Sequence, residues 1–93
     1  MKIYQIDYDL RKQRNYDELY KRIKSYTTWC HPLESTWLIK TDQSALQIHK
    51  HLFGVMDGDD GLLVTCITGE AAWLGVDPRV SEWLKSELSR LAA

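Results

Sequence analysis

Residues 2–9 read KIYQIDYD, and the alternation in this stretch decides the fold. Successive side chains of a β-strand point to opposite faces, so the stretch predicts a strand whose two faces differ. One face is apolar or aromatic and the other is mixed: Tyr4, Ile6 and Tyr8 against Ile3, Gln5, Asp7 and Asp9. The first face suits packing against helices, whereas the second is predicted to stay open to water or to a partner.

Three later stretches carry apolar side chains at helical spacing. They begin after Asn15, after Asp42 or Ser44, and at Asp77, where Pro78 takes the first helical position. The spacings predict helices at roughly residues 16–28, 45–56 and 78–91. The predicted apolar faces are Tyr16, Leu19, Tyr20, Ile23 and Tyr26, then Ala45, Ile48, His49, Leu52, Phe53 and Met56, and finally Val80, Trp83, Leu84, Leu88 and Leu91.

Between the helices lie extended patterns rich in β-branched and apolar residues. They predict strands at HPLE (31–34), STWLIKT (35–41), LLVTCIT (62–68) and, as a short extra strand, AAWLG (71–75). If the first two are separate strands, the order becomes βαββαβ, the ferredoxin-like α+β arrangement of an antiparallel sheet with both helices on one face. We therefore expect one ferredoxin-like domain over residues 1–93, with residues 78–91 as an appended helix. A homodimer that closes over the open sheet face follows as an expectation.

Composition limits the classes of function. A chain of 93 residues with 44% hydrophobic and 27% charged residues is typical of one globular domain. Its net charge of −1 provides no general basic field for nucleic acid, so any such contact must come from a local patch. The two cysteines have no metal or redox spacing, and no apolar run approaches the length of a membrane span. We expect a cytoplasmic protein with no membrane partner.

The two acids of the first strand are the strongest candidate for chemistry. Asp7 and Asp9 share a face and lie about 6.6 Å apart along the strand. Neighbouring carboxylates repel, which favours a bound cation between them or a raised pKa on one of them. Oxygen ligands suit Mg²⁺ or Mn²⁺, and a two-fold axis would double the number of ligands. The alternative is that Asp9 caps the following loop, or that both acids form surface ion pairs with its basic residues.

That loop, RKQRN, is the densest basic cluster of the chain. Its charged residues Arg11, Lys12 and Arg14 lie beside Tyr16 and are candidates for contacts with nucleic-acid phosphates. A run of charges can equally be a solvated face. Three other features favour structural roles: a histidine at a chain break, an acidic turn without the full pattern of a calcium loop, and tryptophans suited to the core or to an interface. The histidine is His31, which precedes Pro32 where the helical pattern ends. The acidic turn is residues 57–61, and the tryptophans are Trp29, Trp37 and Trp73.

Four features carry a resemblance to a known family. They are Tyr8-Asp9-Leu10 at the end of the first strand, LESTW at residues 33–37, the spacing of the remaining helix and strand with the acidic turn before LLVTCIT, and TGEAAW at residues 68–73. Over residues 1–76 the chain resembles the CRISPR-associated protein two (Cas-two) family, and most closely a compact branch often found outside CRISPR loci. Two departures stand out. Glu34 replaces the family's usual glutamine, and a helix ends the chain where the family has a short dimer-swapping tail.

The resemblance implies a ferredoxin-like homodimer that acts in nucleic-acid processing or defence. It assigns Asp9 of both protomers to a cleft at the dimer interface, where a magnesium or manganese ion would support phosphodiester hydrolysis of RNA or DNA. Asp9 is then the catalytic metal ligand, and Asp7 is a helper without a counterpart in the family. Other members bridge DNA between integrase subunits without catalysis, and a related toxin family cleaves RNA. The alternatives are therefore a non-catalytic nucleic-acid- or nucleotide-binding dimer, or a protein-binding toxin–antitoxin element.

Overall fold

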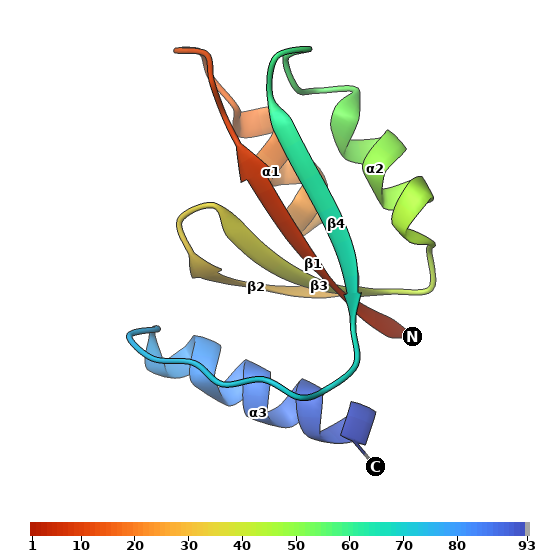
Figure 1. Ribbon diagram of the computed structural model, residues 1–93, viewed down its shortest axis with the longest axis vertical. Coiled ribbons are helices and arrows are strands. Elements are labelled where there is room, and N and C mark those ends of the chain that lie inside the picture. The colour runs from red at the N-terminus through yellow and green to blue at the C-terminus, as the bar shows by residue number, and fades with distance from the viewer. Residues whose placement is uncertain (93) are drawn as a thin grey trace.

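The computed structural model describes residues 1–92 and shows one antiparallel sheet between two layers of helices (Figure 1). The elements follow one another along the chain in the order βαββαβα. They are β1 (Lys2–Asp9), α1 (Asp17–Lys24), β2 (Thr28–Leu33), β3 (Thr36–Thr41), α2 (Ala45–Phe53), β4 (Gly61–Ile67) and α3 (Pro78–Ala92). None of the helices in this part of the chain is long and apolar enough to cross a bilayer.

The sheet has the strand order β2-β3-β1-β4, and every neighbouring pair is antiparallel. The first strand lies in the centre, where Ile6 pairs with Trp37 on one side and with Val64 on the other. This order and the βαββαβ succession confirm the predicted ferredoxin-like fold. The two strands predicted at residues 31–41 are a hairpin, which turns at Glu34 and Ser35.

The apolar face of β1 packs as its alternation predicts. Tyr4, Ile6 and Tyr8 are at most 8% exposed and belong to the larger core. Helices α1 and α2 cover this face of the sheet (Figure 1). They contribute fully buried side chains to that core: Leu19 and Ile23 from α1, with Ile48 and Leu52 from α2.

The other face of the sheet is covered over only part of its length. Ile3 and Leu38 pack there against Leu84 and Leu88 of α3 in a second, smaller core. Figure 1 shows α3 lying across one end of the sheet, well away from the end that carries the loop after β1. The appended helix thus provides cover that the sequence assigned to a partner, while the face around Asp7 and Leu63 stays uncovered.

The first helix is shorter than the pattern predicts. It begins at Asp17, whose backbone N–H donates to the Asn15 side chain at 2.8 Å, and it ends at Lys24. The Ser25 hydroxyl donates to the carbonyl of Arg22 at 2.6 Å and closes the last turn. Residues 28–30 then enter β2, because threonine and tryptophan suit a strand and their backbone pairs with β3.

The second helix begins where one of the two predicted caps lies. Ser44 accepts from the backbone N–H of Gln47, whose side chain accepts in return from the backbone of Ser44, so this serine and not Asp42 is the cap. The predicted apolar face is too wide at its edge. Phe53 is 56% exposed and stacks on the exposed His49, with the ring centres 5.8 Å apart.

The short extra strand predicted at residues 71–75 does not form. Gly69 has φ 113° and Gly75 has φ 76°, and such positive angles turn the chain out of the sheet at both ends of the segment. Between them the Trp73 side chain joins the core under α3, and its indole N–H donates to the Ser81 hydroxyl at 3.0 Å. The segment is therefore held by side-chain packing instead of strand pairing.

The two cysteines should differ strongly in reactivity. Cys30 is buried under α3, and burial raises the pKa of its thiol to about 12, whereas Cys66 is exposed on the edge strand β4. Because the thiolate is the reactive form, we expect iodoacetamide to alkylate Cys66 about a hundredfold or more faster than Cys30. Mass spectrometry of a time course measures both rates. In denaturant the two rates should converge, and equal rates in the native protein would contradict the burial of Cys30.

Candidate functional site

The predicted acids lie on the uncovered part of the sheet face. Asp9 is the last residue of β1 and pairs with Gly61 of β4, and Asp7 pairs with Leu63. Both aspartates line a shallow depression together with Gly61 and Leu63. The alternation of β1 therefore brings the two carboxylates to one face at the same end of the sheet.

Asp7 is held by neutral donors. The Gln5 amide donates to one carboxylate oxygen at 3.0 Å, and the Thr36 hydroxyl donates to the other at 2.6 Å. The side chain is half-buried and forms no ion pair with the basic loop within residues 1–92. Hydrogen bonds from β1 itself and from β3 fix its direction toward the open face.

Asp9 is far more exposed and is paired with a cation. Its side chain is 70% exposed, and one carboxylate oxygen lies 3.1 Å from Nε of Arg11. The guanidinium also lies close to Gly61, where an added Cβ would approach Arg11 Nη2 to 3.3 Å. The ion pair that the sequence left as an alternative to a metal site is thus present for Asp9.

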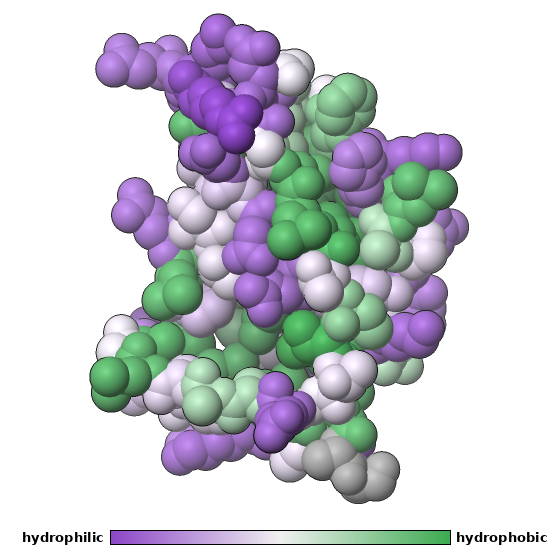
Figure 2. Space-filling view, in the orientation of Figure 1, coloured by the Kyte–Doolittle hydropathy of each residue, from purple (hydrophilic) through white to green (hydrophobic). Residues whose placement is uncertain are grey.

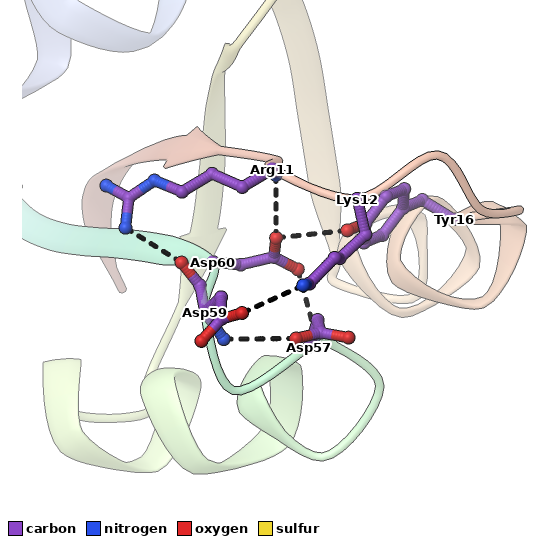
Figure 3. A network of polar contacts seen from close by, with 6 residues as sticks. All are labelled: Arg11, Lys12, Tyr16, Asp57, Asp59 and Asp60. Atoms are coloured by element: carbon purple, nitrogen blue, oxygen red, sulfur yellow. Dashed lines mark hydrogen bonds and ion pairs between the residues drawn. The ribbon is translucent and has the colours of Figure 1, made fainter.

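The basic loop is tied to the acidic turn that precedes β4 (Figure 3). The backbone N–H of Arg11 donates to an Asp60 carboxylate oxygen at 2.8 Å, and Arg11 Nη1 donates to the Asp59 carbonyl at 2.7 Å. Lys12 Nζ lies 2.9 Å from the Asp59 carboxylate. The acidic turn therefore neutralises part of the positive charge of Arg11 and Lys12, which were predicted to contact phosphates.

Asp60 is the centre of this network. It accepts from Arg11, from the backbone of Asp57 at 2.8 Å and from the Tyr16 hydroxyl at 3.0 Å. Partial desolvation opposes its charged form, but these donors and the charge of Arg14 outweigh it and lower the pKa of the carboxyl. Asp60 is thus an ionised anchor that holds two loops together, and all its strong contacts lie within the fold.

Arg14 is the one predicted phosphate-binding residue without a carboxylate partner in the part of the chain that the structure describes. Its guanidinium donates to the Val55 carbonyl at 3.3 Å and lies 4.9 Å from the centre of the Tyr16 ring. The structure therefore places Arg11, Lys12 and Arg14 together at one end of the sheet, but engages each of them in holding loops. Figure 2 shows hydrophilic residues gathered over this end of the molecule.

The carboxylates of this chain are too dispersed to surround a cation by themselves. Among residues 1–92, no three histidine, cysteine, aspartate or glutamate side chains lie close enough together to hold a metal ion. Asp7 and Asp9 face the same depression and offer oxygen atoms, which suit magnesium or manganese. The donor set fits such an ion only if water or a second copy of the chain adds ligands.

An aromatic pocket on the helix-covered face was not predicted as a site. It lies where β1 and the β2–β3 hairpin meet α1, and it is lined by Tyr8, Tyr20, Lys24, His31, Glu34 and Trp37. The sequence assigned its histidine to a turn and its tryptophan to a core or an interface. The hairpin stacks His31 on Trp37. A hairpin between HPLE and STWLIKT was the signal in the sequence from which this contact could have been predicted.

An apolar groove lies between the second sheet face and the segment before α3. Pro32, Leu38, Trp73 and Leu84 contribute to its walls, and Leu33 at its rim is 57% exposed. Leu63 on β4 is 60% exposed, and Leu74 in the lining of the groove is 94% exposed. Figure 2 shows apolar surface over this side of the molecule, on β4 and again near α3. Such exposed apolar surface is typical of an interaction site.

Known proteins match this chain at the level of the fold. No protein-family model and no curated protein matches the sequence. Among solved structures, the crystal structure of a hypothetical protein TT1823 from Thermus thermophilus is similar, with a TM-score of 0.67. The two sequences are 24% identical, and the match covers 83% of this chain and 94% of that one. At this identity the likeness shows a shared fold.

Proposed function

We propose that this chain forms a homodimer of the Cas-two type that processes nucleic acid, with Asp9 as a metal-binding catalytic residue at the dimer cleft. One observation carries the proposal: Asp9 and Asp7 project from the part of the sheet face that α3 leaves uncovered. A second copy on this face would cover exposed Leu63 and Leu33 and would bring two further carboxylates to the cleft.

The chemistry follows from the two carboxylates. Asp9, supported by Asp7, would hold Mg²⁺ or Mn²⁺, and the bound ion would activate water and neutralise a phosphate. Arg11 pairs with Asp9 in the free chain, so a cation must displace it. The displaced guanidinium is then available to a phosphate, together with Arg14.

Cleavage assays test this function directly. Mixed RNA and DNA substrates are incubated with Mg²⁺ or Mn²⁺ and with either the wild-type protein or Asp9→Asn. We expect the wild type to cleave and the variant to lose about a hundredfold or more in rate, since metal stabilisation of the transition state amounts to several kcal/mol. Asp17→Asn is the matched control, because Asp17 is an exposed aspartate in the first turn of α1. Cleavage that survives in Asp9→Asn would refute the role of Asp9.

A second candidate is a dimer that binds nucleic acid or nucleotides without cleaving them. The ion pair between Asp9 and Arg11 favours it, because this pair leaves the exposed acid neutralised in the free chain. A wild-type protein that shifts RNA or DNA in a gel but cleaves nothing would support this function. A protein that neither binds nor cleaves would point to a protein-binding role, as a toxin–antitoxin element or beside an integrase or another defence protein. A pull-down would then identify the partner.

A further inference from the structure

The aromatic pocket between α1 and the β2–β3 hairpin has the volume of a ligand site. It is an open hollow of about 320 Å³, and small-molecule sites span about 300–1,000 Å³. Its floor is Trp37, which is 3% exposed, and its wall includes the side chain of Tyr20. The Trp37 indole N–H donates to the Tyr8 hydroxyl at 3.0 Å, and that hydroxyl donates to the Glu34 carbonyl at 3.2 Å. These bonds fix the floor against the hairpin turn.

The imidazole of His31 is already stacked in the way a base would be. It lies parallel to the Trp37 ring, with 3.7 Å between ring centres and 10° between planes. Its Nε2 lies 3.0 Å from the Glu34 carbonyl. A carbonyl can only accept a hydrogen bond, so Nε2 carries a proton and donates to it. This bond helps to hold the imidazole parallel to the Trp37 ring. The residue is exposed on the surface, so its outer face is accessible to a second ring.

A cation without a carboxylate partner lies beside these rings. Lys24 Nζ is 5.3 Å from the centre of the Trp29 ring and 5.9 Å from the centre of the Trp37 ring. Within residues 1–92 it forms no ion pair, in contrast to Arg11 and Lys12. Trp29 is itself 37% exposed, so both the ring and the ammonium group are open to a ligand.

These features together describe one class of ligand. Aromatic side chains stack on nucleobases irrespective of sequence, and an unpaired lysine contacts a phosphate. Glu34 also lines the pocket, and a glutamate carboxylate can accept from an exocyclic amine of a base. We propose that this pocket binds one nucleobase and its phosphate, supplied by a single-stranded nucleic acid or by a free nucleotide.

The pocket adjoins the carboxylates of the proposed function through the hairpin. Thr36, the first residue of β3, bonds Asp7 on the uncovered face, while the carbonyl of Glu34 bonds Tyr8 on the pocket side. A single-stranded nucleic acid that wraps around the end of this hairpin would reach both the pocket and the uncovered face of the sheet. The inference rests on the proposed function only in taking nucleic acid as the ligand, because neither Asp7 nor Asp9 lines the pocket.

Binding without metal tests the pocket alone. Fluorescence anisotropy of a labelled single-stranded oligonucleotide is measured in EDTA at several salt concentrations. We expect His31→Ala to weaken binding about tenfold, as the loss of one stacked base does, and His31→Phe to retain most of the affinity. His49→Ala is the matched control, since His49 is also an exposed histidine stacked on an aromatic ring. Equal weakening by His31→Ala and His49→Ala would overturn the proposal.

The lysine is tested by the salt dependence. Removing one phosphate contact to a single strand lowers the slope of log K against log salt by about 0.7. We expect this decrease for Lys24→Gln, and an unchanged slope for His31→Ala and for Lys50→Gln, whose lysine is exposed on α2. An unchanged slope for Lys24→Gln would remove the phosphate from the proposal.

Two further ligands separate the sources and the failures. An abasic oligonucleotide of equal length should bind about tenfold more weakly, and equal binding would overturn the base pocket. A mononucleotide that binds alone with the same dependence on His31 would identify a free nucleotide as the source. These binding measurements are made in EDTA, so they do not depend on the metal-supported cleavage proposed for Asp9. If the protein cleaves nothing but binds in a way that depends on His31, only the hydrolytic function is therefore refuted. If it binds none of these ligands, the pocket is refuted.

Discussion

Replacing Trp37 by alanine is expected to lower the free energy of unfolding by about 3–5 kcal/mol, a large share of the roughly 5–15 kcal/mol that stabilises a small domain. Trp37 is 3% exposed in the centre of the sheet, where it pairs with Ile6. Its ring contacts Tyr20, with the centroids 6.2 Å apart, and carries the stacked His31. Alanine leaves a cavity beneath these rings that a rigid sheet cannot close.

Urea unfolding followed by circular dichroism measures this loss. Trp37→Phe keeps a ring but removes the indole donor to Tyr8, so its cost should be smaller than that of Trp37→Ala. Trp29→Ala is the matched control, because Trp29 lies on the neighbouring strand and is 37% exposed. A cost for Trp29→Ala as large as that for Trp37→Ala would show that burial does not set the contribution of these tryptophans.

The fold could be predicted because the decisive patterns are local. The alternation in residues 2–9 determines which side chains of β1 face the helices, and the structure buries Tyr4, Ile6 and Tyr8 as expected. Turn and cap signals placed α2 and β4 within a few residues. The end of α1 was wrong by about one turn, because pairing with β3 draws residues 28–30 into a strand, and periodicity along one segment does not contain that contact.

The surroundings of the candidate site depend on contacts between distant segments. The sequence places Asp7 and Asp9 on one face, and the structure keeps them there. It does not show that the basic loop meets the acidic turn, where Arg11 and Asp60 are 49 residues apart in the chain. The only signal in the sequence was the opposite charge of the basic loop and the acidic turn, and charge alone does not determine which residues pair. The stacking of His31 on Trp37 was hidden for the same reason, since it depends on the register of the hairpin.

The position of α3 on the sheet could likewise not be predicted from the sequence of the helix. Spacing predicts the apolar face of this helix, and that face is buried, with Leu84 and Leu88 at 4% and 5% exposure. The surface that receives it is one end of the second sheet face, which the sequence alone describes as open. The structure therefore divides this face in two: one end is covered by α3, and the other end, around Asp7, is left uncovered.

Replacing Leu84 by alanine should loosen the packing of α3 and lower the free energy of unfolding by about 2–5 kcal/mol. Leu46→Ala is the matched control, a leucine on α2 that is 62% exposed and should cost little. Because Cys30 lies under α3, its alkylation should accelerate in Leu84→Ala by more than the global loss of stability explains. Newly exposed Ile3 and Leu38 should also promote association that rises with protein concentration, measurable by light scattering. A variant as stable as Leu46→Ala, with slow alkylation of Cys30, would show that α3 does not hold this face closed.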